Sequence, residues 1–97
     1  MPEAAYGKSN CWLTAVLFDP AIAGISREDV RRHLESLNIE SRPVWKPMHL
    51  QPVFAGAPAY VNNVSESLFK QGLCLPSGSS LQPEQLDYIA GLIKALW

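Results

Sequence analysis

Prolines constrain the fold of this chain more than any other residue type. Pro43, Pro47, Pro52 and Pro58 follow one another closely in the middle of the sequence. Each proline locks its φ angle and removes a backbone hydrogen-bond donor, so regular structure is interrupted where it occurs. We therefore expect residues 43–58 to form an ordered but irregular segment with one short helical turn, and regular elements to lie on either side of it.

Three short apolar runs are the candidate strands. Residues 11–18, with the sequence CWLTAVLF, are apolar on both faces and rich in β-forming residues. This composition predicts a strand that is covered on both sides or central in its sheet. Residues 39–44 form a second candidate, and residues 73–75 form a third that ends at Pro76.

Three other segments have helical patterns. The strongest begins at Ser26, whose S-x-x-D pattern is typical of a capping box, and Asn38 is expected to end it in the left-handed conformation. Its apolar stripe consists of Val30, Leu34 and Leu37. A second helix is expected over residues 64–71 with Gly72 as its stop, and a third from Pro83 onward. The apolar face of this last helix, expected to cover the sheet, consists of Leu86, Ile89, Ala90, Ile93 and Leu96.

The order of these elements is β-α-β-loop-α-β-α, which predicts an α+β fold: one small sheet of about three strands with helices packed on it. The chain is long enough for one modest core, so residues 1–97 are expected to form a single domain. The net charge of −1 and the sequence pI near 6.0 exclude a global field that attracts nucleic acid or an anionic membrane. No apolar run approaches the ~18–20 residues of a membrane-spanning helix.

The cysteines, Cys11 and Cys74, are far apart and have apolar neighbours. We expect both to be free, reduced and buried in a cytoplasmic protein, because cytosolic thiols are normally kept reduced. They lack the spacing of a zinc site, so no metal is expected. His33 is expected on a solvated helix face. A nucleophile pair of Cys74 with His49 would need a proximity and an orienting group that the sequence does not show.

The most informative polar segment covers residues 41–52. It carries three potential cations, Arg42, Lys46 and His49, together with the indole of Trp45. Arginine grips a carboxylate or phosphate with paired hydrogen bonds, lysine offers a point charge, tryptophan a stacking face, and histidine a hydrogen bond or a proton. Such a set suits an anionic, partly flat ligand, although on spacing alone a surface loop with solvated charges is the simpler interpretation.

Three stretches of the sequence resemble the C-terminal part of DegT/StrS-type aminotransferases. They are GISR at residues 24–27, SRPVWKPMHLQPVF at residues 41–54 and LFKQGLCLPSG at residues 68–78. Members of this family are pyridoxal-phosphate-dependent enzymes of fold type I that aminate nucleotide-linked keto-sugars. The middle stretch is most similar to members that act on UDP-linked 4-keto-6-deoxy-N-acetylhexosamines, usually with glutamate as amino donor, in the synthesis of surface glycans. The resemblance covers residues 10–97, but only the C-terminal portion of the enzyme.

The resemblance implies that the middle stretch approaches an active site assembled at a homodimer interface. His49 would face the sugar nucleotide or the cofactor, and Arg42, Trp45 and Lys46 would contact a phosphate or the donor carboxylate. A pyridoxal enzyme also needs a Schiff-base lysine and an acidic group against the pyridine nitrogen. The lysines of this chain are Lys8, Lys46, Lys70 and Lys94. None of them lies in a segment that resembles the cofactor-lysine region of the family.

The large cofactor-binding domain is therefore expected outside residues 1–97, which would be the small C-terminal domain. No catalytic residue is expected in this chain, and alone it is expected to bind no pyridoxal phosphate and to be inactive. A different interpretation is a stand-alone module that binds a nucleotide-sugar or a protein partner in a regulatory or structural role. In a purely structural variant of this interpretation, the helix from Pro83 would be the surface for oligomerisation.

Overall fold

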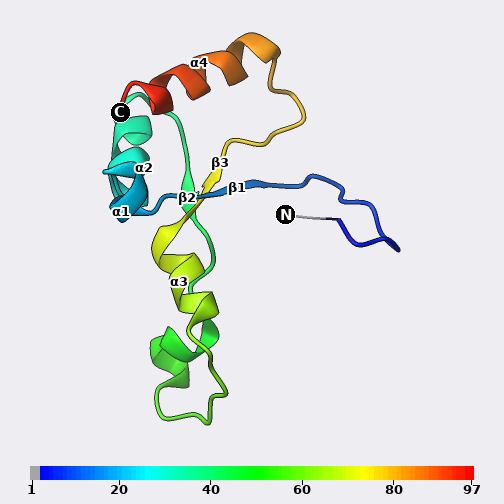
Figure 1. Ribbon diagram of the computed structural model, residues 1–97, viewed down its shortest axis with the longest axis vertical. Helices are drawn as coiled ribbons and strands as arrows, with labels where there is room; N and C mark the ends of the chain where they lie inside the picture. Colours follow the sequence, from blue (N-terminus) through cyan, green and yellow to red (C-terminus); the bar gives the residue numbers. More distant parts are fainter. Residues whose placement is uncertain (1–2) are drawn as a thin grey trace.

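The computed structural model describes residues 3–97 and contains a three-stranded antiparallel sheet (Figure 1). Its strands are β1 (Thr14–Leu17), β2 (Arg42–Pro43) and β3 (Gly72–Leu75), in the order β1-β3-β2. The helices of the described residues are α1 (Pro20–Ala23), α2 (Arg27–Ser36), α3 (Val64–Gln71) and α4 (Pro83–Lys94). Two 3₁₀ turns, η1 (Met48–Leu50) and η2 (Pro52–Phe54), precede α3. The predicted α+β fold with a small sheet is confirmed.

The elements lie in two groups on either side of the sheet. Helices α1, α2 and α4 gather on one side, and residues 44–71, which we call the arm, extend away on the other (Figure 1). The arm contains both 3₁₀ turns and α3. The radius of gyration is 15.7 Å, above the ~13 Å of a compact domain of about 100 residues, so the chain is elongated.

None of the helices in the described part of the chain is long and apolar enough to cross a membrane.

β3 is the central strand and carries the best-buried residue of the sheet. It pairs antiparallel with β1 along its whole length. On its other side Cys74 and Leu73 lie opposite Arg42 and Pro43 of β2. Leu73 has 0% of its surface exposed, because both neighbouring strands and the helical group surround it.

The prediction that residues 11–18 form a covered or central strand is wrong. Only Thr14–Leu17 is a strand, and it lies at the edge of the sheet. Its partner β3 has four residues, so only Thr14–Leu17 forms the ladder, and one further backbone hydrogen bond joins Phe18 to the carbonyl of Gln71 (2.9 Å). Leu17 is 55% exposed, and Cys11, which precedes the strand, is exposed rather than buried. Cys74 is buried as predicted, and both cysteines are free.

The core lies where α2 and α4 meet the sheet. Its buried hydrophobic members are Phe18, Val30, Leu34 and Leu73, and α2 and α4 are in contact beside them. The C-terminal part of the chain packs partly buried residues against this cluster: Ile89, Leu92, Ile93 and Leu96.

Two predicted core faces are covered less than expected. Leu37 is exposed because α2 ends at Ser36 and Leu37 is its C-cap residue. Leu86 and Ala90 of α4 are also exposed. The helix packs beside α2 and leaves part of its apolar face open, so it does not cover the sheet as expected.

Local hydrogen bonds set the bounds of α2 as predicted. Ser26 Oγ accepts from the backbone N–H of Asp29 (3.2 Å), and the Asp29 carboxylate accepts from the backbone N–H of Ser26 (2.8 Å). Asn38 has φ +59° and ends the helix. The short helix α1 was not predicted; the Asp19 carboxylate caps it by accepting from the N–H of Ala21 (3.0 Å).

Residues 43–58 form the irregular segment that the prolines predict, with two 3₁₀ turns rather than one helical turn. Pro52 is the first residue of the second turn, where its missing N–H costs nothing. The strand expected over residues 39–44 is reduced to Arg42–Pro43. Pro43 has no donor of its own, and just beyond the strand the backbone N–H of Val44 donates to the carbonyl of Gly72 (3.2 Å).

Gly72 follows α3 as predicted, but for a different reason. It is not left-handed: its φ is −86°, and it is the first residue of β3. A Cβ at this position would lie 2.8 Å from both methyl carbons of Val44 and would also meet the carbonyl oxygen of Leu68. Glycine is therefore required here because the two ends of the arm approach each other closely.

We expect Gly72→Ala to lower the free energy of unfolding by about 1–3 kcal/mol, because the new methyl group overpacks a buried contact. Gly91→Ala in α4 is the matched control, since nothing lies within 4 Å of its added Cβ. That control should be neutral or should stabilise the chain by up to about 1 kcal/mol. Urea unfolding measures both changes, and equal midpoints for the two variants would contradict the close approach.

Charged side chains form a network along the exposed face of α2. Arg31 lies between two carboxylates, with Nη2 2.8 Å from Oε1 of Glu28 and Nη1 3.0 Å from Oε2 of Glu35. Arg32 Nε is 3.1 Å from the same Glu28 oxygen. The hydrogen bond from Arg31, supported by that from Arg32, lowers the pKa of Glu28 from 4.5 to about 2.

This depressed pKa predicts how stability changes in acid. The contribution of Glu28 is fully present above its ordinary pKa of 4.5 and is lost as the pH falls toward about 2. Glu28→Gln should therefore lower the urea midpoint at about pH 7. The variant should also lose less stability than the wild type as the pH falls from 4.5 to about 2. Glu84→Gln is the control, since Glu84 has no ion-pair partner among residues 3–97. An identical acid response of wild type and Glu28→Gln would disprove the role of this network.

Candidate functional site

His49 is the least exposed of the four candidate substrate-binding residues that the sequence singled out. It lies in η1, and its side chain is 20% exposed. Its Nε2 is 3.0 Å from Oε1 of Glu66, which stands in the first turn of α3 and is 25% exposed. The contact joins the outgoing and returning halves of the arm. Sequence reasoning missed Glu66, because no local pattern connects two residues that are 17 positions apart.

The segment before His49 is held by hydrogen bonds of its own. The side-chain nitrogen Nε2 of Gln51 donates to the backbone carbonyl of Lys46 (3.1 Å), and the backbone N–H of Leu50 donates to the carbonyl of Pro47 (3.0 Å). The Lys46 side chain itself is exposed. The proline-stiffened turn therefore carries a histidine held by Glu66 and, three positions before it, an exposed lysine.

Arg42 and Trp45 are exposed and lie close to the sheet. The Arg42 guanidinium pairs with Glu40, with Nε donating to Oε1 over 2.6 Å. The Trp45 indole is 68% exposed and faces that of Trp12, with ring centroids 5.9 Å apart and an interplanar angle of 37°. Both groups can still meet a ligand, since neither is enclosed by protein.

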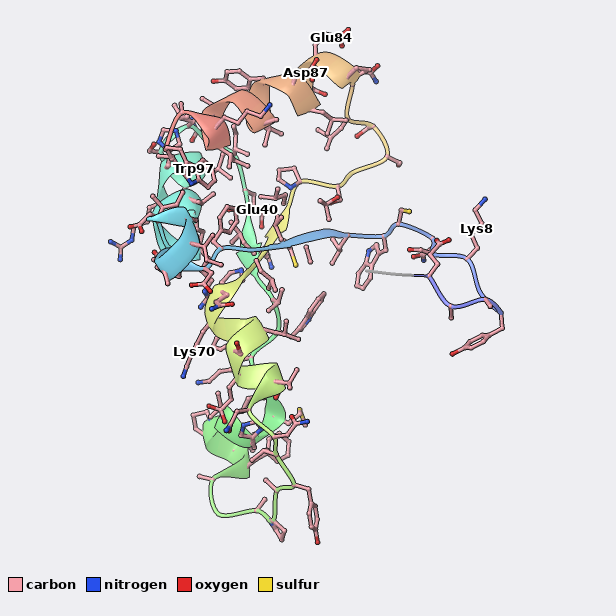
Figure 2. All side chains as sticks on the ribbon, viewed as in Figure 1. Lys8, Glu40, Lys70, Glu84, Asp87 and Trp97 are labelled. Carbon is pink, nitrogen blue, oxygen red and sulfur yellow. The ribbon has the colours of Figure 1, made fainter. Side chains whose placement is uncertain are left out.

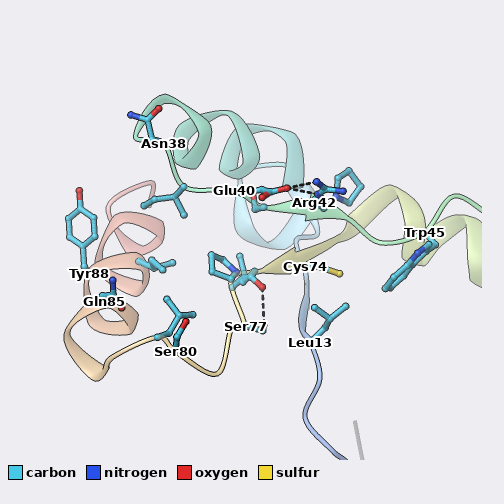
Figure 3. A pocket seen from close by; sticks show the side chains of 18 residues that line it. Leu13, Asn38, Glu40, Arg42, Trp45, Cys74, Ser77, Ser80, Gln85 and Tyr88 are labelled. Carbon is cyan, nitrogen blue, oxygen red and sulfur yellow. Dashed lines mark hydrogen bonds and ion pairs between the residues drawn. The ribbon is translucent and has the colours of Figure 1, made fainter.

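An open groove of about 950 Å³ lies between the sheet and α4 (Figure 3). Arg42 and Trp45 line it from the β2 side, and Gln85 and Tyr88 line it from α4. Ser77 continues the wall, with Oγ accepting from the N–H of Thr14 (2.8 Å) and donating to the carbonyl of Leu75 (2.8 Å).

Lys46 and His49 do not line this groove. The structure therefore divides the predicted set into two pairs: Arg42 with Trp45 at the groove, and Lys46 with His49 on the arm. The buried thiol of Cys74 lines the groove, away from His49, and no hydrogen bond joins the two residues in the described part of the chain. The polar residues of α4 were not singled out from the sequence, because amphipathic helix surfaces commonly carry such residues.

His33 differs from the expectation of a solvated residue. It is half-buried, and within residues 3–97 its Nε2 is a buried atom without a hydrogen-bond partner. The cause is position: His33 lies three residues after the buried Val30, on the same side of α2, and is partly covered there.

The residues of this chain alone do not fit a pyridoxal phosphate site. All four lysines are exposed, and none lines the groove. Lys8 and Lys70 point away from the body of the chain (Figure 2). Of the acids, Glu40 lines the groove but already pairs with Arg42. Within the described residues no three His, Cys, Asp or Glu side chains gather to hold a metal ion.

Comparison with known proteins places this geometry in a family. The model of the DegT/DnrJ/EryC1/StrS aminotransferase family matches residues 1–94. EpsN of Bacillus subtilis (strain 168), provisionally named a pyridoxal phosphate-dependent aminotransferase, is 46% identical over 101 residues, which cover 100% of this chain and 25% of EpsN. The GDP-perosamine synthase of Escherichia coli O157:H7 is 34% identical over 86 residues, 89% of this chain and 22% of that enzyme.

Solved structures agree in fold. A DegT/DnrJ/EryC1/StrS aminotransferase from Brucella abortus has a TM-score of 0.74 at 28% identity, over 98% of this chain and 25% of that one. The aminotransferase TlmJ from Streptoalloteichus hindustanus has a TM-score of 0.79 at 21% identity, over 98% and 24%. This chain thus spans about a quarter of the length of the proteins it matches. The chain belongs to the DegT/DnrJ/EryC1/StrS aminotransferase family.

Proposed function

We propose that this chain is the small C-terminal domain of a pyridoxal-phosphate-dependent aminotransferase that aminates a nucleotide-linked 4-keto-sugar for surface glycans. The observation that carries the proposal is the 46% identity to EpsN, which extends over the whole chain. The GDP-perosamine synthases support a sugar nucleotide as the substrate class. The sequence of residues 41–54 favours a UDP-linked sugar as the substrate. We further propose glutamate as the amino donor and a cytoplasmic homodimer as the assembly.

The shape and surface of the chain support the proposal that this domain packs against further protein. Its core is small and its shape is elongated. Exposed apolar side chains that gather in one region of a surface favour an interface there. The exposed large hydrophobic residues of the arm are Trp45, Met48, Val53, Tyr60, Val61, Val64 and Leu68. In the whole enzyme we place the cofactor domain and the second subunit against this surface.

Within that enzyme each pair of polar residues has a separate role. His49 contacts the sugar part of the substrate, because its ring is held in place and half-buried. Lys46, exposed and three positions earlier in the chain, meets a phosphate as a point charge. Arg42 binds a second anionic group, such as the donor carboxylate, after exchanging its surface partner Glu40 for it. Trp45 offers a flat face to the nucleotide base.

This chain alone should neither transaminate nor bind pyridoxal phosphate one to one, because its lysines are exposed and no acid stands ready for the pyridine nitrogen. Pyridoxal phosphate titration followed by borohydride reduction and peptide mass mapping measures this. We expect weak labelling spread over the exposed lysines. Stoichiometric labelling of one lysine, or transamination by the chain, would contradict the proposal.

In the aminotransferase that carries this chain, His49→Ala should lower kcat/KM for the nucleotide-sugar by about 10- to 100-fold, the effect of losing one hydrogen bond to a fixed polar group. Lys94→Ala, an exposed change in the last turn of α4, is the control and should leave kcat/KM unchanged. Steady-state kinetics with thermal unfolding of each variant provide the measurement. Unchanged kinetics of a folded His49→Ala enzyme would exclude this role.

A further inference from the structure

Two polar side chains on opposite halves of the arm form a contact that the overall fold does not require. His49 is on η1 and Glu66 is on α3, and their side chains meet at 3.0 Å while each is about three-quarters covered. Neither belongs to the core, which is built from the helices and strands at the other end of the molecule. The contact therefore orders the arm locally rather than the domain as a whole.

The chemistry of the contact determines which ring nitrogen carries the proton. An ionised carboxylate only accepts hydrogen bonds, so the Nε2 that faces Glu66 must be the N–H donor. In the neutral ring the other nitrogen, Nδ1, is then an acceptor. Among residues 3–97 Nδ1 has no hydrogen-bond partner, and it is not one of the buried unpartnered atoms. It is therefore available to a ligand.

We propose that Glu66 is a positioning residue for His49. Glu66 accepts the Nε2–H and so turns Nδ1 outward as a hydrogen-bond acceptor for a hydroxyl group of the nucleotide-linked sugar. This inference rests on the proposed function, and it assigns to His49 the recognition of a donor group of the sugar, whereas Arg42 and Lys46 recognise the anionic groups. The other contacts of the turn, through Gln51 and Leu50, hold the backbone of η1 but leave the ring free to rotate.

The positioning contact is tested first on this chain by nitrogen-15 NMR of the histidine rings. We expect His49 in the Nε2–H tautomer with an exchange-protected Hε2 signal. Glu66→Ala should abolish that signal, and Glu66→Gln should retain it, because the amide oxygen can still accept. Glu84→Gln, an exposed change in the first turn of α4, should have no effect. An Nδ1–H tautomer, or a protected signal that survives Glu66→Ala, would overturn the proposal.

The consequence for recognition is tested by a double-mutant cycle in the enzyme that carries this chain. Glu66→Ala should lower kcat/KM for the nucleotide-sugar about tenfold, Glu66→Gln should restore most of the loss, and Glu66→Ala should cost nothing further in a His49→Ala background. A full additional loss in that background would show that Glu66 acts independently and would overturn the inference.

The substrate role of His49 and the positioning role of Glu66 can be disproved separately. If His49→Ala leaves kcat/KM unchanged, the substrate role of His49 is wrong, even where the NMR experiment finds the ring held by Glu66. If His49→Ala is impaired but Glu66→Ala is not, the proposed function stands and the positioning role of Glu66 is wrong. Thermal unfolding of Glu66→Ala, compared with Glu66→Gln, separates both results from a loss of folded protein.

Discussion

The burial of Leu73 at the centre of β3 is the contact on which the rest of the structure depends. It belongs to the same cluster as Phe18, which follows β1, and Val30 and Leu34 of α2. The strand that carries it pairs with β1 on one side and β2 on the other. Segments from the beginning, middle and end of the chain therefore meet at one short strand. Without the apolar burial at this point, the two-residue ladder of β2 would contribute little.

The same strand determines where the arm begins and ends. Val44 leaves β2 and Gly72 enters β3, and the absence of a side chain at Gly72 lets the two approach closely. Proline residues then restrict the outgoing half of the arm to two 3₁₀ turns, and α3 returns beside them. This return places Glu66 against His49. The close approach at Gly72 closes the arm at the sheet, and the polar pair joins its two halves further out.

The division of the polar residues follows from this architecture. Arg42 and Trp45 stay with the sheet and line the groove beside α4, whereas Lys46 and His49 travel out along the arm. Exposed apolar side chains accompany both regions. Such a surface is costly for an isolated domain, and the proposed function places further protein against it. This agrees with a chain that spans about a quarter of its relatives.

The sequence by itself determined the elements whose signals are local. The capping box from Ser26 and the left-handed Asn38 bounded α2, Pro83 began α4, and the prolines interrupted regular structure in the arm, since each acts within a few residues. Only the tertiary structure decided that residues 73–75 rather than 11–18 are central, because strand order depends on which partners meet and not on composition. It also separated the four predicted site residues into two pairs and brought Glu66 to His49. The contact of Glu66 with His49 and the two walls of the groove join residues far apart in the chain, and no local pattern encodes them.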